Sequence, residues 1–156
     1  MINKPRGFFG IGIENGKNSQ NINCLLRSAH CLGAAFTFVI GNRYKKSKAD
    51  TTKSYRNIPL FEYEDIFHFY HSTPKDTTII AVEFPNEQAA SLYNFVHPER
   101  AIYLLGAEDC GLSLEALAFS NYILKIDSRL CLNVGVSGSI IMYDRLVKEN
   151  KRQLNG

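Results

Sequence analysis

The stretch AIYLLGAEDCGLS, residues 101–113, joins an apolar run to a polar segment that contains two glycines. The five apolar residues predict a buried strand, and Gly106 follows that strand directly. Glycine lets a backbone approach a ligand closely, and open α/β sheets bind ligands at the carboxyl ends of their strands. We therefore predict a binding segment at residues 106–111, although a plain strand-to-helix turn capped by Ser113 would give the same pattern.

Apolar runs alternate with helical periodicity along the rest of the chain. We expect strands at residues 8–14, 34–40, 77–82, 101–105 and 122–126, and helices at residues 21–32, 62–71, 88–95, 114–119 and 133–148. Asn21 is the expected N-cap of the first helix, and Gly33 is its expected end. Strands that alternate with helices predict an α/β fold, with a mainly parallel sheet and helices on both faces.

The sequence is mildly basic, and part of its positive charge is concentrated in one loop. Eighteen Lys and Arg residues stand against 15 Asp and Glu residues, a net charge of +3, which permits an acidic partner such as RNA without requiring one. The long loop expected at residues 41–57 is either solvated or a contact for an RNA backbone. We expect RNA contact, through Arg43, Lys45, Lys46 and Arg56.

The cysteines and histidines show no spacing typical of a metal site. The four cysteines form no CxxC pair, and His68 and His71 lack a third ligand, so we expect no metal. Cys24 and Cys31 are interpreted as small apolar residues of the core. We find neither a signal peptide nor an apolar run long enough to cross a bilayer, so we expect a cytoplasmic protein without a membrane partner.

Two further segments place polar residues near the starts of expected helices. In NINCLLR, residues 21–27, Arg27 lies among apolar residues, which is unusual unless it binds an anion or a partner. A capping Asn21 with a salt-bridged Arg27 is the alternative. In CLNVGVSG, residues 131–138, small residues open a helix, as they also would in an ordinary Asn-capped helix. Neither segment alone identifies a function.

Taken together and in this order, the three segments resemble the motifs of the SpoU/TrmH-type RNA methyltransferases of the SPOUT superfamily. Residues 21–29 match the first motif, residues 105–112 the second and residues 131–144 the third. The resemblance covers residues 7–148, which is nearly the whole chain.

The resemblance implies both a fold and a reaction. The fold is the α/β-knot, in which a mainly parallel sheet carries a C-terminal trefoil knot, and the protein is a homodimer. The reaction is transfer of a methyl group from S-adenosylmethionine to a ribose 2′-hydroxyl of tRNA or rRNA, without a metal. Residues 1–156 are then a single SPOUT methyltransferase domain with no separate RNA-binding domain.

The chain departs from the family pattern at three places. Asn23 replaces the usual glycine of the first motif, Cys131 stands where many members carry serine, and the stretch from Ile126 to Cys131 is shorter than is typical. These departures motivate an alternative function. The protein would then be a catalytically inactive RNA- or nucleotide-binding protein on the same fold.

The resemblance also implies which residues form the site. Arg27 is the proton acceptor or, since a guanidinium keeps its proton up to a pH above about 12, the group that stabilises an RNA phosphate or the developing alkoxide. Asn21 orients Arg27, Glu108 supports the site, and Asn133 positions the donor or the ribose. The residues expected to bind the cofactor are Val82, Glu83, Leu105, Gly106, Gly111, Ile126, Cys131 and Leu132.

Overall fold

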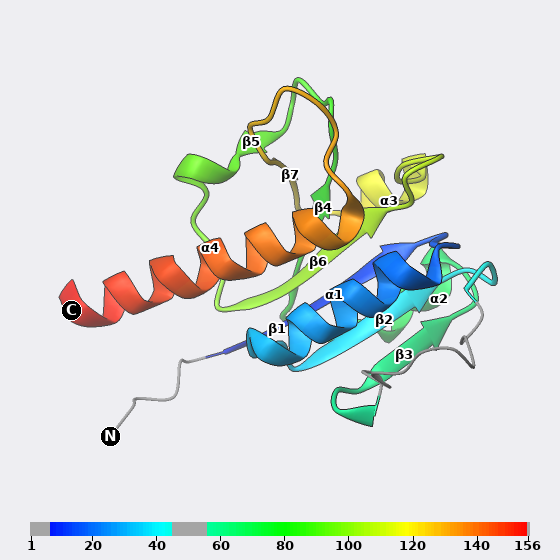
Figure 1. The fold of residues 1–156 in the computed structure, drawn as a ribbon, viewed down its shortest axis with the longest axis horizontal. Coiled ribbons are helices and arrows are strands. Elements are labelled where there is room, and N and C mark those ends of the chain that lie inside the picture. The colour runs from blue at the N-terminus through cyan, green and yellow to red at the C-terminus, as the bar shows by residue number, and fades with distance from the viewer. Residues whose placement is uncertain (1–6, 45–55, 156) are drawn as a thin grey trace.

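A computed structural model describes residues 7–44 and 56–155 of the protein (Figure 1). Seven strands form one sheet in the order β3-β2-β1-β6-β4-β7-β5, and all neighbouring strands in it are parallel. The strands are β1 (Phe8–Glu14), β2 (Phe36–Ile40), β3 (Leu60–Tyr63), β4 (Thr78–Val82), β5 (Ala90–Ser91), β6 (Arg100–Gly106) and β7 (Tyr122–Lys125). The parallel sheet that the sequence predicted is therefore confirmed.

Helices cover both faces of this sheet, as predicted. The long helices α1 (Ser19–Cys31) and α4 (Val134–Asn155) pack against each other on one face (Figure 1). The short helices α2 (Ile66–Ser72) and α3 (Leu114–Phe119) lie on the other face. Each pair buries its own apolar core against the sheet, and β6 contributes alternate side chains to both cores.

The helix α1 begins earlier than the sequence predicted, and this changes the role of Asn21. Its N-cap is Asn18, whose side-chain oxygen accepts from the backbone N–H groups of residues 20 and 21. Asn21 therefore lies inside the helix, with its side chain free for other contacts. The interpretation of Cys24 and Cys31 as core residues is wrong, because both are exposed beside the buried residues of the helix.

Two expected helices are partly or wholly replaced by other elements. In the segment 62–71, strand β3 comes first, and α2 begins only after Asp65, whose carboxylate accepts from His68 N at 2.7 Å. The segment 88–95 forms the short strand β5 and a single 3₁₀ turn (Leu92–Asn94). The strands β3 and β5 lie at the two edges of the sheet, where a few residues suffice to extend it.

The closing helix α4 is longer than predicted, and it carries apolar residues on its exposed side as well as on its buried side. Gly138, Ile141 and Met142 are buried against α1 and the sheet. A second apolar stripe on this helix faces outward, because Val136, Ile140 and Tyr143 are 45%, 36% and 60% exposed. The helix thus has an apolar surface on a side that the rest of the described chain does not cover.

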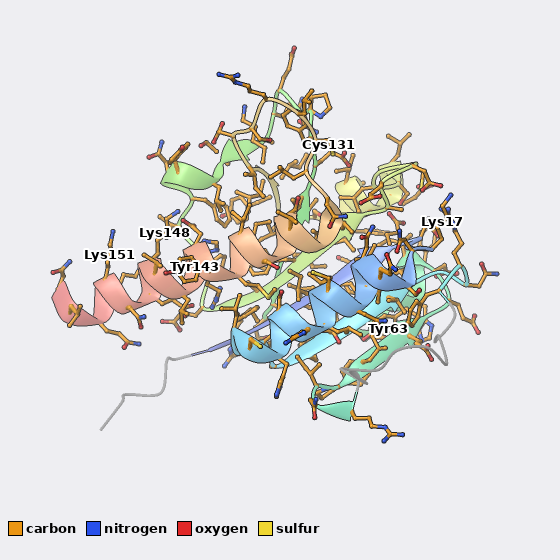
Figure 2. All side chains as sticks on the ribbon, viewed as in Figure 1. Lys17, Tyr63, Cys131, Tyr143, Lys148 and Lys151 are labelled. Atoms are coloured by element: carbon orange, nitrogen blue, oxygen red, sulfur yellow. The ribbon has the colours of Figure 1, made fainter. Side chains whose placement is uncertain are left out.

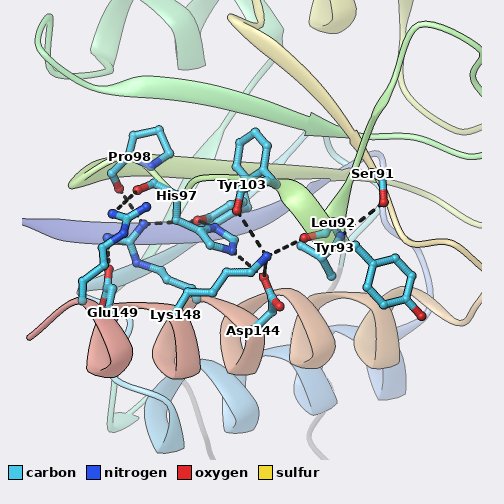
Figure 3. A network of polar contacts seen from close by, with 12 residues as sticks. Ser91, Leu92, Tyr93, His97, Pro98, Tyr103, Asp144, Lys148 and Glu149 are labelled. Atoms are coloured by element: carbon cyan, nitrogen blue, oxygen red, sulfur yellow. Dashed lines mark hydrogen bonds and ion pairs between the residues drawn. The ribbon is translucent and has the colours of Figure 1, made fainter. Parts of the chain in front are cut away.

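A buried polar network ties the segment before β6 to α4 (Figure 3). Arg145 is 2% exposed and donates to the carbonyls of residues 98 and 99 and to the Tyr103 hydroxyl. His97 Nδ1 lies 2.5 Å from that hydroxyl, and His97 Nε2 lies 2.8 Å from an Asp144 oxygen. Burial lowers the pKa of His97 to about 4, although the hydrogen bond to Asp144 opposes this shift. His97 is therefore neutral at pH 7.

Candidate functional site

The carboxyl ends of β4, β6 and β7 meet at a cavity of about 270 Å³. Three segments line it: the backbone after β4, the loop after β6, and residues 126–137, which lead from β7 into α4. Every residue that the sequence assigned to cofactor binding lines this cavity, namely Val82, Glu83, Leu105, Gly106, Gly111, Ile126, Cys131 and Leu132. The structure thus brings together residues that lie up to 50 positions apart, from 82 to 132.

The loop after β6 folds back tightly beside the cavity. Gly111 N donates to Ala107 O at 2.8 Å, and the φ of Gly111 is 63°, a conformation that favours glycine. A Cβ at Gly106 would lie 2.4 Å from the Gly111 carbonyl carbon. Both glycines are therefore needed for the shape of the loop.

Two carboxylates at strand ends hold the same loop in place. Glu14, which ends β1 and is 3% exposed, accepts from Ser113 N at 2.8 Å and from Ser113 Oγ at 2.6 Å. Glu83 accepts from Leu112 N at 3.1 Å. These bonds satisfy a buried charge and fix the loop against the sheet. Glu14 was not predicted as a functional residue. The sequence feature that could have indicated it is a charged residue at the end of an otherwise apolar strand.

Three side chains from distant parts of the chain form an amide–carboxylate cluster, which comprises Asn21, Glu108 and Asn133. Glu108 Oε1 accepts from Asn21 Nδ2 at 2.9 Å and from Asn133 Nδ2 at 2.8 Å. Asn133 Nδ2 also donates to Asn21 Oδ1 at 2.9 Å. Glu108 additionally lines the cavity, so the cluster lies at its rim. Its second oxygen, Oε2, has no hydrogen-bond partner among residues 7–44 and 56–155.

Asn133 has two functions in this arrangement. Its side-chain oxygen accepts from Gly135 N at 2.9 Å and from Val136 N at 3.3 Å, so it caps the start of α4. Its amide nitrogen makes the cluster contacts. The capping interpretation and the site interpretation of this residue are therefore compatible, because they use different atoms.

Arg27 lies apart from the cluster. It is exposed on α1, and it neither lines the cavity nor contacts Asn21. It makes no hydrogen bond or ion pair with the residues that the structure describes. Asn21 contacts Glu108 and Asn133, and it does not contact Arg27. The other predicted catalytic residues, Asn21, Glu108 and Asn133, are in direct contact.

The predicted RNA-binding residues lie at separate places. Arg43 follows the carboxyl end of β2 and forms a two-point ion pair with Asp109, with N–O distances of 2.7 and 3.3 Å. Arg56 is exposed and precedes the amino end of β3. Lys45 and Lys46 lie outside the described residues. The ion pair between Arg43 and Asp109 was not predicted from the sequence.

Asp109 is held by two cations. Lys17 Nζ lies 2.8 Å from Asp109 Oδ2, the same oxygen that Arg43 NH2 contacts. The hydrogen bonds from Arg43 and Lys17 hold the pKa of Asp109 well below its ordinary value, and Asp109 raises the pKa of Arg43. Lys17 lies near the start of α1, and Cys131 lies on the loop that leads into α4 (Figure 2).

Other kinds of site find no support among the described residues. Within residues 7–44 and 56–155, no group of three or more His, Cys, Asp or Glu side chains is arranged to hold a metal ion. None of the described helices is both long and apolar enough to span a membrane. The four cysteines are unpaired and exposed.

A parallel sheet with a cavity and a polar cluster at the carboxyl ends of its strands defines an α/β enzyme that binds its ligand at this edge. The sequence profile of the SpoU rRNA methylase family matches residues 9–143, and the chain therefore belongs to that family. The protein is thus an RNA methyltransferase of the SpoU type. No curated protein matches the chain by sequence.

Solved structures share the fold at low sequence identity. A protein described by "2-OH methylation of C/U34 on tRNA" superposes with a TM-score of 0.82 at 22% identity, over 95% of this chain and 99% of its own. The A. aeolicus TrmH/SpoU tRNA modifying enzyme gives 0.81 at 16% identity, over 96% of this chain and 79% of its own. The SpoU methyltransferase AviRb from Streptomyces viridochromogenes, in complex with AdoMet, gives 0.77 at 21% identity, and the match covers 94% of this chain but only 60% of AviRb.

Proposed function

We propose that this protein transfers the methyl group of S-adenosylmethionine to a ribose 2′-hydroxyl of tRNA or rRNA. The position of Glu108 carries the proposal, because this residue belongs both to the cavity and to the amide–carboxylate cluster. A methyl donor in the cavity and a hydroxyl at the cluster would be in contact, as the transfer requires. Family membership and the similar protein described by 2-OH methylation of tRNA support the same reaction.

The cavity suits a nucleoside that carries a positive charge. Leu105, Ile126 and Leu132 offer apolar surface for a flat base, and the strand ends offer backbone groups for its edge. The carboxylates of Glu83 and Glu108 favour a cation. When bound, S-adenosylmethionine supplies an electrophilic methyl group, so the transfer requires no metal. A similar SpoU protein is known in complex with AdoMet, which supports this donor.

The cluster residues orient the hydroxyl and move its proton. Asn21 and Asn133 hold Glu108 Oε1, which leaves Oε2 to accept a hydrogen bond from the 2′-hydroxyl and then its proton. Arg27 lies six residues, or about 9 Å of helix axis, beyond Asn21. In this proposal the exposed guanidinium of Arg27 stabilises an RNA phosphate or the developing alkoxide.

We propose further that two copies of the chain associate through the exposed stripe of α4. The stripe adjoins two neighbouring segments, residues 92–93 and 126–127, and Tyr93 in the first of them is 79% exposed. Together with α4 these segments enclose a hollow of about 550 Å³ that is lined mainly by apolar side chains. An apolar surface of this kind is typical of an interface between subunits.

A trefoil knot around the cofactor cavity and a cytoplasmic location remain part of the proposal.

Two measurements test the reaction. Calorimetry measures the binding of S-adenosylmethionine, and radiolabelled donor measures transfer to bulk tRNA and rRNA from cells that lack the protein. We expect binding, followed by transfer into nucleotides whose 2′-O-methyl group blocks alkaline cleavage of the next phosphodiester bond. Methylation of a base would contradict the proposed acceptor. Binding without transfer to any RNA would favour an inactive RNA-binding protein, and an absence of binding would exclude the proposed donor.

A further inference from the structure

The ion-pair cluster of Lys17, Arg43 and Asp109 lies next to the proposed catalytic residues. Asp109 directly follows Glu108 in the loop after β6. A second hollow, of about 120 Å³, is lined by Lys17, Asn18, Asn21, Glu108 and Asp109, among others. This hollow therefore connects Lys17 and Asp109 to the amide–carboxylate cluster, and Arg43 adjoins it through its ion pair with Asp109. A polynucleotide whose ribose lies at Glu108 would pass over this hollow.

The contacts that hold Asp109 are those that a phosphate group would use. Arg43 presents two N–H donors in a fork, and Lys17 presents an ammonium group to the same carboxylate. A guanidinium fork binds a carboxylate and a phosphate with the same two-point geometry. Asp109 thus occupies the position in which a phosphate would satisfy both cations.

The exposure of the three side chains indicates that this occupant is exchangeable. The side chains of Lys17, Arg43 and Asp109 are 61%, 31% and 42% exposed. Ion pairs that remain in contact with water are weak, since solvent competes with each partner. A phosphate on a polyanion also releases bound counterions when it pairs with a cation, which favours the exchange.

We propose that Lys17 and Arg43 bind an RNA phosphate adjacent to the target ribose, and that Asp109 occupies this phosphate site in the free protein. RNA binding then replaces one anion by another without leaving either cation unpaired. The inference rests on the proposed function, because it assumes that RNA places a ribose at Glu108. Lys17 becomes an RNA-binding residue that its sequence context did not indicate.

The exchange predicts effects of opposite sign on RNA binding. Affinity for fluorescently labelled bulk tRNA is measured for the full chain over a range of salt concentrations. Lys17→Ala and Arg43→Ala should each weaken binding about tenfold and lower the slope of log affinity against log salt by about 1. Asp109→Asn should strengthen binding severalfold, because it removes the competing anion. This gain should disappear when Lys17→Ala and Arg43→Ala are also present.

Matched controls separate this site from a general effect of charge. Lys75, an exposed lysine that precedes the amino end of β4, serves as Lys75→Ala, and the exposed Glu115 of α3 serves as Glu115→Gln. The inference is overturned if Asp109→Asn weakens binding or acts no more strongly than Glu115→Gln. It is also overturned if Lys17→Ala and Arg43→Ala match Lys75→Ala while the wild-type protein still methylates RNA. A wild-type protein that binds the donor but binds no RNA overturns the proposed function as well.

Discussion

Glu108 is the residue at which the two parts of the proposed site meet. Its side chain borders the cavity, and one of its oxygens accepts hydrogen bonds from two asparagine side chains. Two N–H donors on one oxygen fix the carboxylate without neutralising it. The other oxygen is thereby left as an acceptor for a substrate hydroxyl.

Replacing Glu108 by Gln tests this role, because glutamine has the same size but carries no negative charge. We expect methyl transfer to fall by at least about 100-fold, which is the lower range for loss of a general base. Binding of S-adenosylmethionine should persist and weaken only modestly, because glutamine keeps the size of the side chain and Glu83 still favours the positive charge. Rates from single-turnover assays and calorimetric binding separate the two effects. Glu115→Gln is the matched control, and equal activity of both variants would exclude Glu108 as the proton acceptor.

At the residue scale, the sequence motifs predicted which residues line the cavity better than they predicted which side chains pair with one another. The cofactor residues were assigned by resemblance, and the structure places all of them around one cavity. The pairing of Asp109 with Arg43 and Lys17 could not be predicted, because these residues are 66 and 92 positions apart and belong to no common motif. Glu14 was missed for the same reason: its partner Ser113 lies 99 positions away.

At the scale of elements, close contact between α1 and α4 is what brings Asn21 and Asn133 together. Gly138 permits this contact, because a Cβ there would lie 2.2 Å from Leu25 Cδ1 and 3.3 Å from Ile11 Cδ1. Both of these side chains are at most 2% exposed, so neither can move aside freely. The small residues that open the third motif are thus explained by the distance between the two helices.

Gly138→Ala should therefore lower the free energy of unfolding. Alanine in a helix interior is intrinsically favoured over glycine by about 0.8–1 kcal/mol. Overpacking of a close-packed core typically costs about 1–3 kcal/mol, so we expect a net loss of about 1 kcal/mol. Urea unfolding measures it, with Asn150→Ala on an exposed part of α4 as the control. A more stable Gly138→Ala variant would show that the two helices can separate at little cost.

The polar network around His97 gives the attachment of β6 to α4 a defined dependence on pH. The pKa of His97 is about 4 in the folded protein, against an ordinary value near 6.5, chiefly because the ring is buried. Between these values the unfolded chain binds a proton that the folded chain does not, so stability decreases as pH falls through this range. The contribution of His97 is fully present above pH 6.5 and lost as the pH approaches 4.

The titration of His97 alone should lower the free energy of unfolding by about 2 kcal/mol between pH 7 and pH 5. Urea unfolding at the two pH values measures the total change. The variant His97→Gln cannot take up this proton, so its change should be smaller by that amount. An identical change in both proteins would mean that folding does not lower the pKa of His97.

The elements themselves were predictable where a periodic pattern was long. The strands β1, β2, β4, β6 and β7 and the helices α1, α3 and α4 were each predicted, with shifts at their ends. The strand β3 was missed because part of it was assigned to the helix expected at residues 62–71, and the two residues of β5 leave too little alternation in the sequence to be recognised. Their pairing depends on neighbouring strands that already exist in the sheet.

At the scale of the whole molecule, the exposed stripe of α4 is the feature that the isolated chain does not explain. If this stripe joins two copies, Ile140→Asp and Tyr143→Asp should each yield monomers, because a buried unpaired carboxylate is costly. Light scattering after size-exclusion chromatography measures the mass. Leu114→Asp is the control, because Leu114 is 82% exposed on α3, on the opposite face of the sheet. A wild-type protein that remains monomeric at micromolar concentration would rule out this dimer.

The order of the cluster residues along the chain has a consequence for synthesis in the cell. Asn21 and Glu108 leave the ribosome before Asn133, and Asn133 is fixed only when α4 docks on α1. A nascent chain interrupted before residue 133 lacks one of the three cluster residues. Translation therefore delivers this site only after Asn133 has been added, and products that stop before this residue lack the complete cluster.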